Sequence, residues 1–243
     1  MMMTCYSRQL RGVGALVVAL ALLALQGCAT VARPDPRDPL ESYNRTMFGF
    51  NDAVDTAVLK PVAKGYRAVT PNWFRKGVSN FFNNLEDGWS ALNNALQGRK
   101  LDTSDNLGRF MVNSTLGMLG LVDVASDLQI ERHPADFGLT LGRWGVPPGP
   151  YVVLPVLGPF TLREVAALPV EMKGQPKYTL GDQDAHTVLP VVSLIDQRTK
   201  YLNASELLDS ASLDAYLFQR DAYLQRQRNI QYDGNPPEEV TEP

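Results

Sequence analysis

The residue with the clearest chemistry in this sequence is Cys28. The stretch Leu25-Gln26-Gly27-Cys28 follows an apolar or small run from Gly12 to Leu25, and Arg8 and Arg11 precede that run. A short apolar run behind positive residues is typical of a cleaved signal peptide, and this one is too short to span a bilayer comfortably. A cysteine at such a cleavage point receives thioether-linked diacylglycerol and an amide-linked third chain. We therefore predict lipid attachment at Cys28; the alternative is an ordinary signal peptide with an incidental cysteine.

Three acyl chains would anchor the mature protein essentially permanently, because each buried methylene contributes about 0.8 kcal/mol. Ala29 follows the cysteine, where an aspartate would usually signal retention at the inner membrane. This favours the outer membrane, on its inner, periplasm-facing leaflet. Once Cys5 is removed with the signal and Cys28 is acylated, no thiol remains for a disulfide, a thiolate nucleophile or a zinc site.

Side chains suited to catalysis are sparse. His133 and His186 are the only histidines, and no HExxH, GxSxG or Walker-type motif occurs. His133 and Asp136 suggest at most two metal ligands, and a histidine at a turn is the commoner case. Two carboxylate pairs offer acid–base chemistry in principle, although caps or solvated faces explain them as well: Glu86 with Asp87, and Asp123 with Asp127. We predict no enzyme, no metal and no cofactor.

The composition argues against a nucleic-acid partner. The formal net charge is −3, and removal of residues 1–27 makes the chain more acidic because that segment carries arginines and no acid. After the signal, no window holds eighteen consecutive apolar residues, so we expect no conventional transmembrane helix. Deep membrane contact must then come from amphipathic helices. The remaining length suffices for one substantial domain or two small ones.

Amphipathic helices make up most of the predicted elements. Asp38 as N-cap with Glu41 predicts a helix that runs to Pro61. Its apolar stripe is Leu40, Tyr43, Met47, Phe50, Val54 and Val58. A second helix is predicted from Ser79 to Gly98, where glycine supplies a left-handed end. Its apolar face is Phe82, Leu85, Trp89, Leu92 and Leu96, and its second face carries Asn83, Asn84, Asn93 and Asn94.

Further helix signals follow along the chain. Ser104 predicts an N-cap, the run from Leu116 to Val122 predicts a helix-turn-helix tip, and Thr161 to Glu164 forms a capping box. A shorter apolar run, Val188 to Ile195, leads to a final helix from about Ser212 to Ile230. That helix carries three arginines that either meet phosphates or carboxylates or form an ordinary solvated face: Arg220, Arg226 and Arg228.

The segment from Phe137 to Pro159 combines glycine and proline with strongly apolar residues. This density of glycine and proline excludes a long helix and a central strand. An irregular apolar segment is tolerated at membrane depth only when it packs on protein or lines a wet cavity. The residues alone leave two interpretations open, a buried loop that crosses the core and a cavity-lining loop.

Motifs in a consistent order resemble the MlaA/VacJ lipoprotein family. The opening motif is Asp38-Pro39-Leu40-Glu41, followed by Asn44-Arg45 and Met47-Phe48-Gly49-Phe50-Asn51. The resemblance covers roughly residues 38–228, and so many ordered motifs are far more specific than a single pattern. Later matching segments include Pro61-Val62-Ala63, Leu96-Gln97-Gly98, Asp136-Phe137-Gly138, Trp144-Gly145-Val146, Gly149-Pro150-Tyr151 and Leu154-Pro155-Val156-Leu157-Gly158-Pro159.

The resemblance implies an all-α, ring-shaped multi-helix assembly, with amphipathic helices and an apolar Gly/Pro-rich hairpin that line a central channel. It implies that phospholipids misplaced in the outer leaflet pass through this channel to a soluble periplasmic carrier of the Mla type, which serves an inner-membrane ABC transporter. Lipid asymmetry of the outer membrane is the outcome. The other implied partner is an outer-membrane porin trimer.

By resemblance, two groups of residues are expected to act at the channel. The hairpin group is Phe137, Gly138, Gly142, Gly145, Gly149 and Tyr151, and the gating group is Gly49, Phe50 and Asn51. The asparagine face of the second helix is expected to line a path for head groups. Pro147 and Pro148 depart from the family pattern and predict a stiffer hairpin, and the stretch from Val170 to Thr187 matches poorly.

These observations predict four segments. They are a signal peptide (1–27), an acylated tether (28–37), a helical domain (38–230) and a disordered acidic tail (231–243). Two other functions stay open beside the phospholipid conduit. One is a porin-associated scaffold lipoprotein that transports nothing, and the other is a lipoprotein hydrolase acting on phospholipid or cell wall.

Overall fold

The computed structural model describes residues 35–211 and 214–237, so Cys28, the signal peptide and most of the tether lie outside the described residues. Within these ranges the chain is helical, as predicted, with one two-stranded antiparallel hairpin. The elements are α2 (Glu41–Val54), the π-helical turn η1 (Asp55–Leu59), α3 (Lys60–Val69), α4 (Asn72–Leu96), α5 (Lys100–Thr115), α6 (Val124–Asp127), α7 (Phe137–Arg143), β1 (Tyr151–Leu154), β2 (Gly158–Thr161), α8 (Leu162–Gly174), α9 (Pro176–Thr179), α10 (Ala185–Ala211) and α11 (Ala215–Gln231).

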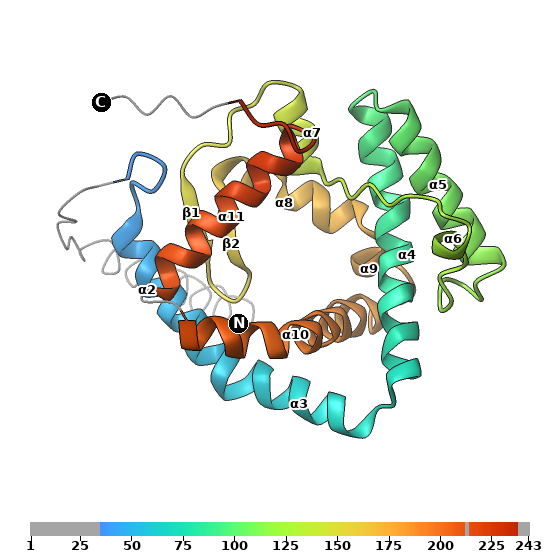
Figure 1. Ribbon diagram of the computed structural model, residues 1–243, viewed down its shortest axis with the longest axis horizontal. Helices are drawn as coiled ribbons and strands as arrows, with labels where there is room; N and C mark the ends of the chain where they lie inside the picture. Colours follow the sequence, from blue (N-terminus) through green and yellow to red (C-terminus); the bar gives the residue numbers. More distant parts are fainter. Residues whose placement is uncertain (1–34, 212–213, 238–243) are drawn as a thin grey trace, which may run out of the picture.

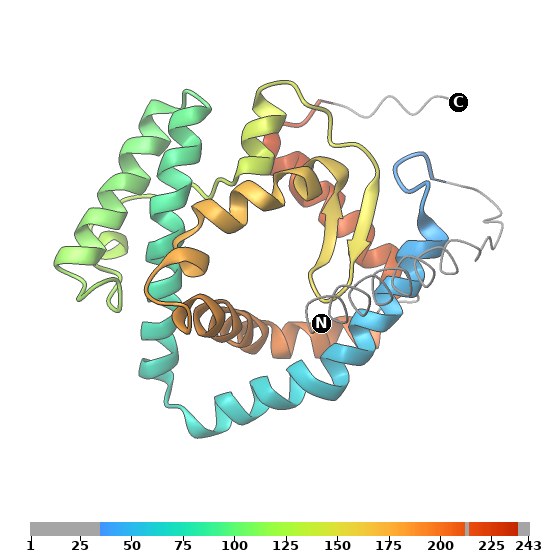
Figure 2. The same cartoon turned by 180° about the vertical axis from the view of Figure 1, so that it is seen from behind.

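The elements follow one another around a ring, which Figure 1 shows from one side and Figure 2 from the other. One arc consists of α2, η1 and α3, and α4 forms the opposite side. The circuit is closed by α8, α9 and α10 together with the hairpin and α11. Helices α5 and α6 lie outside the ring against α4, and α4 with α5 forms the most extensive helix pair of the molecule.

The beginning of α2 differs from the prediction. The helix starts at Glu41 with Leu40 at the N-cap position, and no side chain caps it. The Asp38 carboxylate instead accepts a hydrogen bond from Asn44 Nδ2 at 2.7 Å, and Asp38 is buried. The predicted cap is therefore wrong, because contacts in the folded core occupy the carboxylate.

The predicted helix end at Pro61 is also wrong, since the helical path continues to Val69. In η1 the Lys60 N–H donates to Asp55 O, five residues back. Pro61 then lies in the first turn of α3, where the missing proline N–H costs little. The π-helical turn therefore lets the chain pass a proline without leaving the helical path.

Helix α4 begins at Asn72, seven residues before the predicted cap at Ser79. Ser79 lies within the helix and its Oγ donates to Asp196 Oδ2 at 2.8 Å, which joins α4 to α10. The predicted left-handed end is confirmed, because Gly98 has φ +77°. Ser104 likewise lies within α5, which begins at Lys100, so that predicted cap is wrong.

An ion-pair cluster joins α4 to α5. Arg109 is buried on α5 and pairs with Asp87 Oδ2 at 3.1 Å and with Asp123 Oδ1 at 3.0 Å. Arg132 also pairs with Asp87. Burial raises the pKa of the Asp87 carboxyl despite the two guanidinium groups beside it. Asp123 also caps α6, so one member of each predicted carboxylate pair serves the structure.

A buried apolar cluster lies where the hairpin meets α2 and α11. Tyr151, Val153 and Tyr216 are its buried members, and the rings of Phe48 and Tyr216 meet edge to face with centroids 5.8 Å apart. The capping box at Thr161 and Glu164 is confirmed and fixes the turn from β2 into α8. The core therefore holds the hairpin between the first and last helices of the ring.

Large apolar side chains are exposed at one corner of the ring and at the turn between α5 and α6 outside it. Val69 is 81% exposed and Trp73 75% exposed at the corner between α3 and α4. The predicted helix-turn-helix tip is confirmed as a turn between α5 and α6, and it exposes Leu116, Met118, Leu119, Leu121 and Val122. No helix in the described ranges is long and apolar enough to cross a membrane.

The last two helices also differ from the predicted bounds. The apolar run at Val188 lies inside the long helix α10, and α11 begins at Ala215 with Asp214 as its cap. The predicted tail starts too early, because α11 includes Gln231, and Asp233 pairs with Arg99 at 2.8 Å. Asp233 also pairs with Arg143, so it is part of the folded domain.

Candidate functional site

A cavity of about 510 Å³ lies between α2, η1, β2, α10 and α11. Its volume falls within the range of small-molecule sites, about 300 to 1,000 Å³. Phe48, Pro159 and Phe218 contribute apolar surface, and Phe218 is 48% exposed. Most of the other lining residues are polar or charged, so the cavity suits a molecule with both apolar and charged parts.

An ion pair forms part of the cavity wall and joins η1 to α10. Arg198 Nε lies 2.6 Å from Asp55 Oδ1, and Arg198 Nη2 lies 2.7 Å from Asp55 Oδ2. This bidentate geometry is the strong form of an arginine–carboxylate contact. The pair fixes the distance between the two helices on this side of the cavity.

Two asparagines of α2 hold strand β1 by its backbone. The Asn44 amide donates to Tyr151 O at 2.9 Å and accepts from Val153 N at 2.8 Å. The Asn51 amide donates to Leu154 O at 2.9 Å and accepts from Val156 N at 2.7 Å. These amides make hydrogen bonds to backbone N–H and C=O groups of β1 and its turn that would otherwise lack partners.

The turn between β1 and β2 is strained at Val156, whose φ is +65°. A β-branched residue rarely adopts this left-handed conformation, which persists only where surrounding contacts impose it. The hydrogen bond from Val156 N to Asn51 is one such contact. Asn51 therefore helps to hold the hairpin tip beside the cavity.

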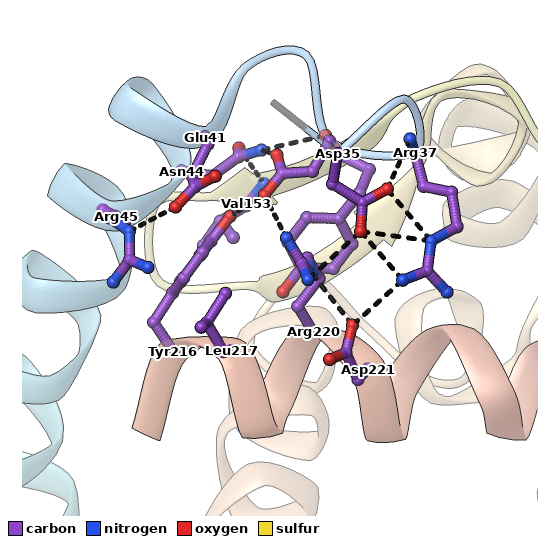
Figure 3. A network of polar contacts seen from close by, with 12 residues as sticks. Asp35, Arg37, Glu41, Asn44, Arg45, Val153, Tyr216, Leu217, Arg220 and Asp221 are labelled. Atoms are coloured by element: carbon purple, nitrogen blue, oxygen red, sulfur yellow. Dashed lines mark hydrogen bonds and ion pairs between the residues drawn. The ribbon is translucent and has the colours of Figure 1, made fainter. Parts of the chain in front are cut away.

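A network of charged and polar side chains fixes the amino-terminal segment to α11, and Figure 3 shows it from close by. Arg220 pairs with Asp35 at 3.2 Å and with Asp38 at 3.4 Å, and the hydroxyl of Tyr216 donates to Asp38. The hydrogen bond from Arg37 lowers the pKa of the Asp35 carboxyl to about 2. Burial raises the pKa of Tyr216, so its hydroxyl remains a donor.

Of the two alternatives for Arg220, the solvated face is wrong. Arg220 is buried and pairs with carboxylates. Arg226 follows Arg220 by six residues on α11, and it lines the cavity instead. A second, larger cavity of about 1,200 Å³ lies on the other side of α11, beside Arg37 and Gly149. Ala222 and Arg226 line both cavities, so α11 is the partition between them.

The structure spreads the predicted hairpin group over three places. Phe137, Gly138 and Gly142 belong to α7, and a Cβ on Gly142 would lie 2.7 Å from the Arg163 guanidinium. Gly145 (φ +93°) and Gly149 (φ +68°) lie in the loop that follows. Tyr151 is fully buried in the core.

Of this hairpin group, Gly149 lines the larger cavity and no member lines the smaller one within the described chain. The loop is tied to α8, since Arg163 donates its backbone N–H to Pro148 O and its side chain to Val146 O. These contacts are consistent with the expected stiffness of Pro147 and Pro148.

The three residues of the gating group follow one another on α2, but they do not share the same surroundings. Asn51 lines the smaller cavity, whereas Phe50 is 46% exposed and a Cβ on Gly49 would meet no atom within 4 Å. Gly49 and Phe50 thus lie on the free surface of the helix.

The expectation that the α4 asparagines line a path for head groups is wrong for three of the four. Asn84, Asn93 and Asn94 are buried and bonded to protein groups. Asn84 donates to Ser114, Asn93 to Trp89 O and Asn94 to His133 O. Asn83 is half-buried beside a small pocket of about 40 Å³.

The candidate metal ligands His133 and Asp136 do not form a site. His133 Nε2 lies 3.2 Å from Asp105, and Asp136 accepts from Leu139 N as the cap of α7. His186 contacts Thr179 O. No group of three potential metal ligands occurs in the part of the chain that the structure describes.

The residues that sequence reasoning missed are Asp52, the Asp55–Arg198 pair and Phe218. Asp55 and Arg198 are 143 positions apart, so no local pattern relates them. Phe218 and Asp52 each lie on the surface of a helix. The sequence alone does not show whether such a position faces a cavity or open solvent. Arg226 was identified as a possible phosphate contact, and the structure places it at the cavity.

Known proteins resemble the chain along most of its length. A family model described as "MlaA lipoprotein" matches residues 36–230. The "Intermembrane phospholipid transport system lipoprotein MlaA" of Escherichia coli (strain K12) is 36% identical over 229 residues, which cover 86% of this chain and 85% of that protein. The protein of the same name from Haemophilus influenzae is 34% identical and covers 90% of each chain.

A solved structure described as "Structural basis for maintenance of bacterial outer membrane lipid asymmetry" has a similar fold. It matches with a TM-score of 0.71 and 39% sequence identity, over 80% of this chain and 98% of the solved chain. The resemblance inferred from the ordered motifs is therefore confirmed by the sequence and the fold together, and the chain belongs to the MlaA lipoprotein family.

Proposed function

We propose that this protein is a non-enzymatic phospholipid conduit that maintains outer-membrane lipid asymmetry. Phospholipids misplaced in the outer leaflet enter the ring, occupy the 510 Å³ cavity and leave toward a soluble periplasmic carrier. The observation that carries this proposal is the cavity's mixed lining, with Phe48 and Phe218 beside charged groups, in a chain of the MlaA lipoprotein family. An amphiphile is the kind of molecule that needs both surfaces at once.

The exposed apolar side chains support a position in the membrane. Soluble monomers rarely expose large contiguous apolar patches. Trp73, Leu116 and Leu119 are each more than two-thirds exposed, and they would be covered by acyl chains in the inner leaflet of the outer membrane. Acyl chains on Cys28 hold the ring there, and the few residues between Cys28 and Asp35 keep the domain against the membrane surface.

The hairpin and α2 supply the gate in this proposal. Asn51 bonds both to Leu154 and to Val156, so a shift of the gating segment moves the hairpin tip. The larger cavity beyond α11 gives an exit toward the carrier, and Ala222 and Arg226 lie at the boundary.

A porin trimer is the proposed partner at the outside of the ring. Energy enters only through the distant ATPase, so passage through the ring is passive.

The proposal is tested by the outer-leaflet phospholipid content of a deletion strain, complemented with wild type or with Cys28→Ala. We expect phospholipid to rise in the deletion and to be corrected by the lipidated form alone. Unchanged lipid levels would favour the porin-associated scaffold.

A His133→Ala/His186→Ala double variant addresses the hydrolase alternative. We expect this variant to restore lipid asymmetry fully, because neither histidine lines the 510 Å³ cavity. Loss of complementation by a folded double variant would favour the hydrolase.

A further inference from the structure

Arg226 is exceptional among the arginines that the structure describes. Every other arginine in the described ranges makes a hydrogen bond or an ion pair, most of them to carboxylates or backbone carbonyls. Arg226 makes none with the described chain, although it is exposed and lines both cavities. A guanidinium without a protein partner at a cavity wall is available to a ligand.

Asp52, on another helix of the same cavity, is its acidic counterpart. Its side chain is exposed on α2 and lines the 510 Å³ cavity, and its carboxylate has no partner among the described residues. The neighbouring acid Asp55 is different, because its charge is taken up by Arg198. The cavity thus offers a ligand one carboxylate on α2 and one guanidinium on α11.

We propose that this cavity recognises a zwitterionic head group with a primary ammonium, of the phosphoethanolamine class, through Arg226 and Asp52. The guanidinium of Arg226 donates to the phosphate oxygens, since its planar donors match a phosphate. The Asp52 carboxylate accepts hydrogen bonds from the ammonium group. Phe48 and Phe218 line the same cavity and accommodate the apolar part of the lipid.

An anionic head group without an ammonium satisfies only half of this pair. Its phosphate can reach Arg226, but it leaves Asp52 without a cation near an added negative charge. Because both side chains are exposed to solvent, screening limits the discrimination to a modest factor. We expect a preference of about fivefold, which corresponds to about 1 kcal/mol.

This inference rests on the proposed function, and one experiment separates the two. Purified protein is equilibrated with vesicles of equimolar phosphatidylethanolamine and phosphatidylglycerol, and the lipids that co-purify with it are quantified by mass spectrometry. The variants are Asp52→Asn and Arg226→Gln. The matched controls are Asp127→Asn and Lys100→Gln, which change exposed charged residues that line neither cavity.

Wild type is expected to bind phosphatidylethanolamine over phosphatidylglycerol by about fivefold. Asp52→Asn brings this ratio close to one, while Arg226→Gln lowers the amount of both lipids and the controls change neither. Equal binding of both lipids by wild type, or an unchanged ratio in Asp52→Asn, overturns the head-group assignment alone. Absence of any bound phospholipid in wild type overturns the proposed function as well. Since neither side chain has a partner among the described residues, circular dichroism should show native folding in both variants.

Discussion

At the scale of single residues, the side-chain amides of α2 explain how a short hairpin is held in register. Asn44 and Asn51 are seven positions apart, which places them on one face of the helix two turns from each other. Each amide bonds to one carbonyl and one N–H of the strand or its turn. The helix thus takes the place that a third strand would have at the edge of β1.

Asn44→Ala should destabilise the protein strongly. The substitution leaves Tyr151 O, Val153 N and the Asp38 carboxylate without the amide, and buried groups without partners cost about 1 to 3 kcal/mol. We expect a loss of about 2 kcal/mol in the free energy of unfolding, measured by urea denaturation. Thr46→Ala on the exposed side of α2 should change stability by less than about 0.5 kcal/mol. Equal effects of the two substitutions would contradict this role.

The carboxyl of Asp136 should make stability depend on pH. Burial, helped by the nearby Glu171 and Glu164 carboxylates, raises its pKa to about 7, despite the hydrogen bond from Leu139 N and the charge of Arg163. Because the folded pKa lies above the unfolded value, the native state binds more protons between about pH 4 and pH 7.

The stability that Asp136 contributes is therefore complete at low pH and is lost as the pH rises toward 7. The slope is at most about 1.4 kcal/mol per pH unit for one proton. Asp136→Asn should flatten this part of the profile of melting temperature against pH. A variant whose profile has the wild-type slope would show that another group titrates.

At the scale of elements, the cluster around Arg109 holds the α4–α5 pair to the turn beyond it. Arg109→Ala leaves Asp87 buried with Arg132 as its remaining partner, and removing one partner of a buried ion pair costs about 3 to 5 kcal/mol. We expect a fall of about 3 kcal/mol in unfolding free energy. Arg143→Ala, which removes an exposed pair with Asp233, is the control and should cost less than about 1 kcal/mol. Unfolding curves that coincide for the two variants would show that the Arg109 ion pairs do not stabilise the α4–α5 pair.

Sequence patterns predicted these elements where the deciding contacts are local. The Thr161–Glu164 capping box and the left-handed Gly98 depend on neighbours within a few positions, and both are confirmed. Asp38 and Ser79 have side chains that are typical of N-caps. Each instead makes a hydrogen bond with a residue far away in the sequence, Asp38 with Tyr216 and Ser79 with Asp196. Local patterns cannot exclude such distant competition.

The asparagines of α4 show the same limit at the candidate site. An amide bonded inside the core and an amide facing a wet channel have the same residue type and the same helical spacing. Only the positions of Ser114, Thr140 and His133 O show that Asn84, Asn93 and Asn94 are structural. The cavity itself joins α2 to α10 and α11, so no local pattern could have located it.

At the scale of the whole molecule, the ring presents two kinds of surface. Apolar side chains are exposed at one of its corners and at the turn between α5 and α6 outside it, whereas charged side chains and aromatic rings share the cavity beside α11. A protein that only supported a porin would need the first surface and not the second. The combination therefore favours a lipid conduit over a scaffold.

A bulky side chain in the cavity would block lipid and so tests passage through it. Gly145 is a poor position for one, because its φ of +93° strains any side chain. Ala222 is exposed on α11 and lines both cavities, so Ala222→Trp narrows both of them. Ala68→Trp on α3, exposed and outside both cavities, is the matched control.

The measurement is outer-leaflet phospholipid content in a deletion strain that expresses each variant at the wild-type level. We predict that Ala222→Trp leaves phospholipid in the outer leaflet as the deletion does, whereas Ala68→Trp restores asymmetry. Full restoration by a folded Ala222→Trp variant would contradict passage of lipid through the cavity beside α11.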